Sequence, residues 1–163
     1  MTEIDQQYME RAISLAKSAA EIDEVPVGAL IVCRGKIIAE AYNTRERDRC
    51  ATCHAELRAI EAACRTLGGW RLPDSTLYVT LEPCPMCAGA ILHARIDRVV
   101  FGARDPRAGA FGSVINLNEL PLYHKAELCA DVLGEQCSSL LTSYFRRKRE
   151  AKKTPTTEKE LTQ

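Results

Sequence analysis

Helical and strand patterns alternate along almost the whole chain, and this alternation limits the folds that the sequence can adopt. Near the N-terminus, apolar residues recur at the 3.6-residue spacing of an amphipathic helix, from Ile4 through Tyr8 and Ala12 to Ala19. Short apolar runs bounded by turn residues indicate strands elsewhere. Such an order favours an α/β fold in which helices cover both faces of one sheet.

The expected order of elements is helix, hairpin, helix, strand, helix, strand, crossover, strand and helix. This order predicts a three-layer α/β/α fold with a five-stranded mixed sheet, formed as a single domain over residues 1–153. Residues 154–163 are polar and contain a proline, so we expect a disordered tail there. Strands are expected at 27–33, 36–42, 76–81, 98–102 and 126–132, and helices at 4–19, 57–67, 85–94 and 133–145.

The composition is that of a globular protein with one core. The chain has 163 residues, of which 46% are apolar. It contains no apolar run of membrane-spanning length, and its N-terminus lacks the layout of a signal peptide. We therefore expect a cytoplasmic protein that does not enter a membrane. In that compartment the eight cysteines are metal ligands or small buried side chains rather than disulfides.

Two short motifs, each at the start of an expected helix, supply side chains that bind metals. His54-Ala55-Glu56 stands where a polar loop becomes a helix, and Pro83-Cys84-Pro85-Met86-Cys87 stands where a strand becomes the next helix. Residues three apart in a helical turn face the same way. Cys84 and Cys87 can therefore bind one ion together with His54. One imidazole and two thiolates leave the fourth position of a tetrahedral Zn²⁺ open for water, as in catalytic zinc sites.

Glu56 lies two residues after His54 and is not needed as a ligand. A carboxylate at this position can take a proton from zinc-activated water and deliver it to a ring nitrogen and then to a leaving amine. The two motifs together match the signature of the zinc deaminases that act on nucleobases. We therefore predict a catalytic zinc site with Glu56 as its proton shuttle.

A second Cys-x-x-Cys pair, Cys50 and Cys53, offers an alternative. With Cys84 and Cys87 it could form a closed four-thiolate site that only stabilises the fold. The gap between the two pairs is longer than in zinc ribbons. Cys53 also neighbours His54, and adjacent side chains at a helix start point in different directions. We therefore favour the open site. The remaining cysteines lie in apolar patterns where burial is expected: Cys33, Cys64, Cys129 and Cys137.

The net charge is zero, but basic residues gather near the end of the last expected helix. This run is either a solvated helix end that the helix dipole stabilises or a surface that contacts phosphates, and the sequence leaves both readings open. The residues concerned are Arg146, Arg147, Lys148, Arg149, Lys152 and Lys153.

Longer blocks around the two motifs resemble one family, the bacterial tRNA-specific adenosine deaminases of the zinc-dependent cytidine/deoxycytidylate deaminase superfamily. The resemblance covers residues 5–150, and its most specific block is Gly102-Ala103-Arg104-Asp105. That block lies within a longer matching stretch from Arg98 to Pro106. The other blocks are Glu24-Val25-Pro26-Val27-Gly28-Ala29, Trp70-Arg71-Leu72, Leu77 to Ala90, and Phe145-Arg146-Arg147.

This resemblance implies a cytidine-deaminase-like fold and a reaction. The reaction is hydrolysis of the wobble adenosine of a tRNA anticodon to inosine, carried out by a homodimer with one Zn²⁺ per subunit. The resemblance gives the role of zinc ligand to His54, Cys84 and Cys87, and that of proton shuttle to Glu56.

The same resemblance implies three substrate contacts. Asn43 would hydrogen-bond the flipped base or its ribose, Val27 would pack against the base, and Asp105 would contact the anticodon-loop backbone. Taken alone, the residues favour a turn-forming Asn43, a core Val27 and a capping Asp105. An anticodon loop is a suitable substrate because a single-stranded nucleotide reaches a buried site at low unstacking cost.

Two other functions fit the metal motif. One is a deaminase of free bases or nucleosides, such as guanine or cytosine, and the other is a non-enzymatic zinc module that binds RNA. The Gly102–Asp105 block favours the tRNA enzyme over the first. Two departures from the family pattern concern substrate recognition. Cys53 replaces a small apolar residue before His54, and Tyr123 precedes His124 where the family commonly has Asn.

Overall fold

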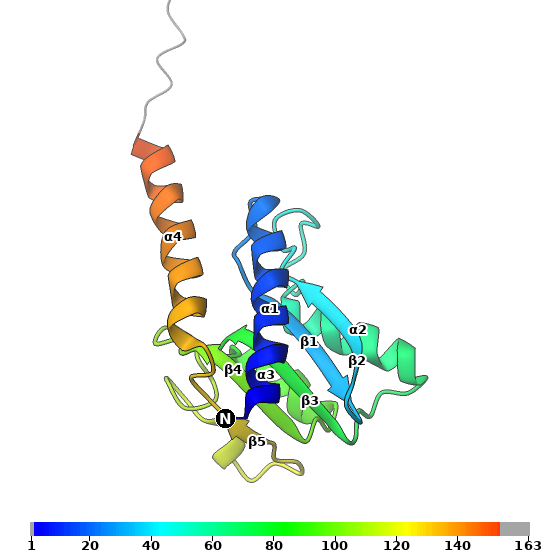
Figure 1. Cartoon of the computed structure of the whole chain (residues 1–163). Helices are drawn as coiled ribbons and strands as arrows, with labels where there is room; N and C mark the ends of the chain where they lie inside the picture. The colour runs from blue at the N-terminus through cyan, green and yellow to red at the C-terminus, as the bar shows by residue number, and fades with distance from the viewer. Residues whose placement is uncertain (1, 154–163) are drawn as a thin grey trace, which may run out of the picture.

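The computed structural model of the chain describes residues 2–153, which form a five-stranded sheet between two layers of helices (Figure 1). The expected three-layer α/β/α fold is confirmed, whereas the expected tail at 154–163 lies outside the described residues. The strands are β1 (Gly28–Cys33), β2 (Lys36–Tyr42), β3 (Ser75–Leu81), β4 (Arg98–Ala103) and β5 (Glu127–Cys129). The helices are α1 (Glu3–Glu21), α2 (Ala55–Leu67), α3 (Pro85–His93) and α4 (Gly134–Lys153), with a short 3-10 turn at Leu117–Glu119.

The strand order brings distant parts of the sequence to one edge of the sheet. The order is β2-β1-β3-β4-β5, with β1 antiparallel to both neighbours and β3, β4 and β5 parallel to one another. The ends of β3 and β4, the start of β1 and the end of β2 therefore share an edge. Val27, Asn43, Cys84 and Asp105 each lie within three residues of one of these strand ends. The topology thus gathers the expected site residues.

The sheet is covered on both faces, which explains why every residue of β1 is buried. Ala29 and Ile31 join the core beneath α2 and α3, whereas Leu30 and Val32 join the core beneath α1 and α4. Helix α1 approaches β1 most closely at Gly28, where a Cβ would lie 2.1 Å from the carbonyl oxygen of Ala12. Only glycine allows this helix to pack so close to the strand.

Two elements near the C-terminus differ from the expectation. The sequence predicts the last strand over 126–132, but the strand covers only Glu127–Cys129, because Asp131 and Leu133 have left-handed backbone with φ of 64° and 52°. Helix α4 continues to Lys153, well past the apolar stripe that predicts its core. Its last turns extend away from the body of the molecule (Figure 1). The last turn carries Lys152 and Lys153, whose positive charges interact favourably with the helix dipole.

Burial of the cysteines outside the two motifs is partly as expected. Cys33 and Cys137 are buried, whereas Cys64 and Cys129 are half-buried. Within residues 2–153, no helix has both the length and the apolar character needed to cross a bilayer.

Candidate metal centre and active site

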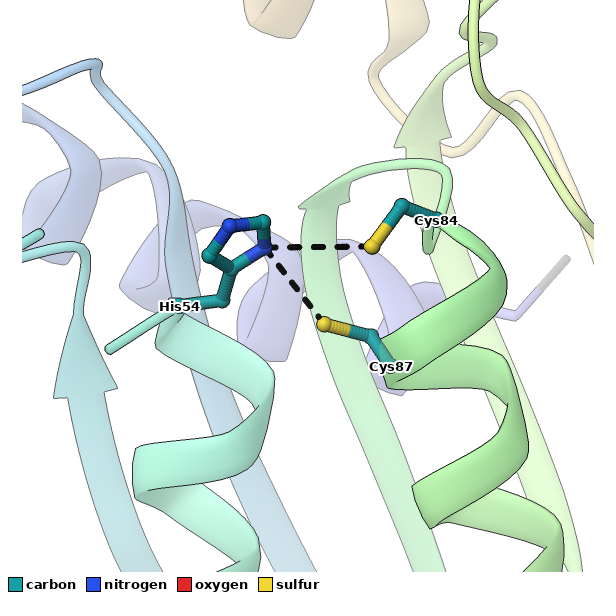
Figure 2. Close-up of side chains that lie close together, drawn as sticks. All are labelled: His54, Cys84 and Cys87. Carbon is teal, nitrogen blue, oxygen red and sulfur yellow. Dashed lines mark hydrogen bonds between the residues drawn. The ribbon is translucent and has the colours of Figure 1, made fainter. Parts of the chain in front are cut away.

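Three side chains from two helix starts converge on one point, as Figure 2 shows. The Nδ1 atom of His54 lies 3.6 Å from the Sγ of Cys87 and 3.9 Å from the Sγ of Cys84. His54 precedes α2, and the two cysteines belong to the first turn of α3. The sequence spacing is therefore realised as a three-atom cluster at the edge of the sheet.

The cluster fits a zinc ion by both distance and chemistry. In a tetrahedral site with ordinary Zn–S and Zn–N bond lengths, a ligand nitrogen and a ligand sulfur lie about 3.6 Å apart. The measured separations of 3.6 and 3.9 Å agree with this value. One imidazole nitrogen and two sulfurs are also ligand types that zinc prefers.

The N-cap side chains of α2 and α3 are free of capping contacts and available to bind a metal. His54 is the N-cap of α2 and Cys84 is the N-cap of α3, and neither side chain makes a capping hydrogen bond. Pro85 at the first position of α3 has no N–H to satisfy. The positive ends of two helix dipoles therefore meet at the cluster, where they favour thiolates.

The thiols of Cys84 and Cys87 have pKa values that are displaced in opposite directions. The hydrogen bond from Cys87, helped by His54, lowers the pKa of Cys84 to about 4 despite partial burial. The same hydrogen bond, together with burial, raises the pKa of Cys87. Contact with Cys84 likewise raises the pKa of His54. The lowered pKa favours the thiolate form of Cys84, which is the form that binds metals.

Glu56 lies in the first turn of α2 and is only 4% exposed. Burial raises the pKa of its carboxyl group, and the electrostatic influence of His54 opposes this shift. Cys87 also affects this pKa through a side-chain hydrogen bond. A buried carboxyl group with a raised pKa beside a metal-ligand cluster can accept and release a proton during catalysis.

The alternative four-thiolate site is not the arrangement that the structure assembles. Among the His, Cys, Asp and Glu side chains of residues 2–153, the group whose ligand atoms lie within 4.8 Å of one another consists of His54, Cys84 and Cys87. Cys50 and Cys53 instead close a turn of their own, in which the backbone N–H of Cys53 donates to the carbonyl of Cys50 at 3.1 Å.

Val27 and Asn43 meet at the open end of the β1–β2 hairpin. The backbone N–H of Asn43 donates to the carbonyl of Val27 at 3.0 Å, and both residues are mostly buried. Val27 belongs to the core beneath α2 and α3, as its residue type alone favours. The side-chain amide of Asn43 does not stabilise a local turn. Its Nδ2 instead donates to the carboxylate of Glu24 at 3.1 Å.

Thr44 connects this hairpin end to the metal cluster. Its backbone N–H donates to the carbonyl of Cys53 at 3.1 Å, and its hydroxyl accepts a hydrogen bond from Arg58 of α2. Asn43 and His54, the sequence neighbours of Thr44 and Cys53, are therefore held on adjacent segments.

Asp105 lies in a turn after β4. Its Oδ1 accepts hydrogen bonds from the backbone N–H groups of Arg107 at 2.9 Å and Ala108 at 3.3 Å. This is the capping role that the residue type alone favours. The backbone N–H of Asp105 donates to the carboxylate of Glu82 at 3.1 Å, and Glu82 is two residues before Cys84.

Glu82 is a buried carboxylate that the motifs did not reveal. It accepts hydrogen bonds from the backbone N–H groups of Asp105, Phe111 and Ser113, and from the Ser113 hydroxyl. Burial raises the pKa of Glu82, but these donors outweigh that effect and leave it below its usual value. Gly109 packs against the same carboxylate, where a Cβ would lie 2.4 Å away. The sequence signal that could have indicated this buried carboxylate is its position directly after a buried strand, β3.

Glu24 is the second buried carboxylate that the motifs did not reveal. It is fully buried, and its two oxygens accept from the Asn43 side chain and, at 2.7 Å, from the backbone N–H of Arg47. The sequence places Glu24 in a polar stretch after α1, where a charged residue usually faces water. Only the fold shows that it lies beneath the hairpin end.

The other two histidines lie away from the cluster. His93, at the end of α3, stacks on Trp70 and has its Nδ1 2.7 Å from the Tyr123 hydroxyl. His124 has its Nε2 2.8 Å from the carbonyl of Ile96. Tyr123, which stands where the family commonly has Asn, is 67% exposed. This departure from the family pattern therefore concerns the surface rather than the cluster of His54, Cys84 and Cys87.

Comparisons with known proteins agree with the geometry. The sequence model of the cytidine and deoxycytidylate deaminase zinc-binding region matches residues 2–103. The chain is 50% identical to the tRNA-specific adenosine deaminase of Bacillus subtilis, over 91% of this chain and 93% of that protein.

Two solved structures differ in how closely they match. One comes from studies of A-to-I editing by tRNA:A34 deaminases at the wobble position of transfer RNA. It superimposes with a TM-score of 0.81 at 42% identity, covering 83% of this chain and 99% of that chain. The guanine deaminase of Bacillus subtilis superimposes with a TM-score of 0.59 at 27% identity, covering 99% of this chain and 100% of that one.

Proposed function

The chain belongs to the family defined by the cytidine and deoxycytidylate deaminase zinc-binding region, and we propose that it hydrolyses adenosine to inosine at the wobble position of a tRNA anticodon. The observation that carries this proposal is the convergence of His54, Cys84 and Cys87 beside buried Glu56. The extended similarity to tRNA-specific deaminases favours RNA adenosine as the substrate over a free base.

We propose His54, Cys84 and Cys87 as the ligands of one Zn²⁺ per chain. When bound, the ion supplies a Lewis acid that activates water for attack on the purine ring. The thiolate character of Cys84 and the two converging helix dipoles support this assignment.

Glu56 is the residue that moves protons in the proposed reaction. Its carboxylate takes a proton from the attacking water and delivers it to N1 of adenine. A second transfer through the same carboxyl group protonates the departing amine at C6. Adenosine and water are thereby converted to inosine and ammonia. Burial of Glu56 supports this role, since a carboxyl group shielded from bulk water exchanges protons with the substrate.

Substrate binding is proposed for Val27, Asn43 and Asp105. Val27 and Asn43 form one edge of the site and are joined by a backbone hydrogen bond. Asp105 lies on the other side, next to the segment that leads into Cys84. An anticodon nucleotide displaced from its stack would be held between these two edges.

The C-terminal end of α4 supplies a further contact in this proposal. Arg146, Arg147 and Arg149 are exposed in the C-terminal half of this helix, whose last turns extend away from the body (Figure 1). Lys148 differs, because it pairs with Asp23 at 2.5 Å. The exposed arginines would contact tRNA phosphates.

Three further expectations remain proposals. Residues 1–153 would act as one zinc deaminase domain, and two copies of the chain would form a homodimer. Exposed apolar side chains in the loop before β5, among them Val114, Ile115 and Leu120, support the dimer. The third is a cytoplasmic location, which the presence of all eight cysteines as free thiols supports.

The decisive experiment is incubation of the zinc-loaded protein with an anticodon stem-loop that carries adenosine at the wobble position, followed by sequencing. Free guanine, cytosine and adenosine are incubated in parallel, and ammonia release is measured. We expect conversion of the wobble adenosine to inosine. Turnover of a free base with none on RNA would overturn the proposal in favour of a free-base deaminase. Ammonia release that is unchanged in Glu56→Ala would contradict the mechanism.

A further inference from the structure

Glu24 is a buried charged group whose contacts lead directly to the proposed substrate site. It is fully buried in the loop between α1 and β1, and its backbone N–H donates to the carbonyl of Ala19 at 3.0 Å. Its carboxylate contacts no cation in the described chain and is held by two N–H donors, one from Asn43 and one from Arg47. Burying a carboxylate is costly unless it is paired or hydrogen-bonded, so these two donors are what offset the burial of Glu24.

The contact with Glu24 fixes the orientation of the Asn43 amide. A carboxylate can only accept hydrogen bonds, so the atom of Asn43 that lies 3.1 Å from Glu24 must be the nitrogen Nδ2. The carbonyl oxygen Oδ1 then points elsewhere. Every fully buried side-chain nitrogen or oxygen in the described part of the chain has a partner. No hydrogen bond joins Oδ1 of Asn43 to any of those residues, so this oxygen is not fully buried. It is therefore available to accept a hydrogen bond from a ligand.

We propose that Glu24 is a positioning residue that locks the Asn43 amide with its oxygen toward the substrate. This inference rests on the proposed function, because it assigns a task to the same site. The arrangement offers the substrate an acceptor oxygen and the second hydrogen of Nδ2. An amide free to rotate by half a turn would offer the wrong groups in about half of the molecules, and fixing it lowers the cost of binding.

Replacing Glu24 with glutamine tests the inference with little change in shape. The backbone N–H of Arg47 lies 2.7 Å from Oε1 of Glu24 and still requires an acceptor. The carbonyl oxygen of the glutamine would occupy that place, which turns its NH₂ group toward Asn43. Two NH₂ groups cannot face each other without loss, so the Asn43 amide would flip and present nitrogen to the substrate.

We expect Glu24→Gln to lower kcat/KM on the stem-loop about tenfold or more, the cost of one misplaced hydrogen bond in a desolvated site, with zinc content unchanged. The effect should vanish in an Asn43→Ala background, because Glu24 acts only through that amide. The double variant should therefore match Asn43→Ala alone.

Asp5→Asn serves as a matched control, since Asp5 is an equally buried carboxylate on the opposite face of the sheet. It should lower stability and leave kcat/KM unchanged.

If the reductions in kcat/KM caused by Glu24→Gln and Asn43→Ala multiplied in the double variant, the inference would be overturned. An unchanged kcat/KM in Glu24→Gln alone would also overturn it. NMR decides the point independently of activity. The Asn43 side-chain NH₂ signal, identified by its loss in Asn43→Ala, should exchange slowly with water in the wild type and rapidly in Glu24→Gln. Rapid exchange in both would overturn the inference. A wild type that is inactive on RNA but shows the predicted exchange would contradict the proposed function while supporting the positioning role.

Discussion

The backbone N–H of Asn43 donates to the carbonyl of Val27 at 3.0 Å, and this bond closes the open end of the β1–β2 hairpin. It joins two residues that are sixteen positions apart in the sequence into one edge of the site. Glu24 supports this edge from beneath, and Glu82 supports the opposite edge that carries Asp105. The metal cluster lies between two loops that are each organised by a buried carboxylate.

We predict that His54→Ala, Cys84→Ser and Cys87→Ser each lose bound zinc and deaminase activity, since each removes one of three ligands. Zinc content is measured by mass spectrometry of the purified proteins. The matched control is the double variant Cys50→Ser/Cys53→Ser, which should keep its zinc. Retention of zinc in His54→Ala with loss in the control would instead establish a four-thiolate site.

Glu56→Gln should retain zinc but release ammonia about 10²- to 10⁴-fold more slowly, because the amide cannot transfer protons. The measurement is single-turnover conversion of the stem-loop, which separates chemistry from product release. Binding of the stem-loop should change little. An equal loss of zinc and activity would assign Glu56 to the metal site instead.

Asp5 of α1 pairs at 2.6 Å with Arg98 at the start of β4, and the Arg98 guanidinium holds the pKa of this carboxyl well below its usual range. Because the folded-state pKa lies below the unfolded one, the folded protein binds fewer protons. The stabilisation is therefore complete above about pH 4 and is lost as the pH falls. We expect Asp5→Asn to cost about 3 kcal/mol at pH 7. Its unfolding free energy, measured in urea, should also depend less on acid pH than that of the wild type.

Glu82→Gln should loosen the loop that carries Asp105. A glutamine offers one acceptor oxygen and one NH₂ group to four donors, so at least one backbone N–H loses its partner at a cost of about 2 kcal/mol. The glutamine oxygen can still accept from the backbone N–H groups of Phe111 and Ser113, which share one carboxylate oxygen of Glu82. The backbone N–H of Asp105 is then the donor left facing the NH₂ group, and its hydrogen exchange should accelerate. Ser113→Ala removes a single donor and should have the smaller effect. Equal protection in Glu82→Gln and wild type would show that the loop is held by other contacts.

Arg146→Ala/Arg149→Ala should weaken binding of the stem-loop and make it less sensitive to salt. Removal of two contacts with the phosphates of a single-stranded loop reduces the slope of log K against log salt by about 1.4. Lys148→Ala is the control, because Lys148 pairs with Asp23 and should alter the slope less. An unchanged slope in the double variant would indicate that this helix end is only solvated.

Several features could be predicted from sequence because they depend on local pattern. The order of helices and strands follows from apolar periodicity, and the two motifs at helix starts follow from the direction of side chains in a first turn. The spacing of His54, Cys84 and Cys87 therefore predicts correctly that these three side chains converge. The end of the last strand could not be predicted in this way, since left-handed backbone at Asp131 ends it.

Only the tertiary structure decided how the rest of the site is held. The strand order β2-β1-β3-β4-β5 brings Asn43, His54, Cys84 and Asp105 to one edge, and strand order depends on long-range packing that local pattern does not encode. The same packing buries Glu24 and Glu82, two carboxylates that sequence alone would assign to the surface. The sequence by itself determined which atoms could bind zinc and move a proton, whereas the fold determined which buried charges hold the substrate-binding residues in place.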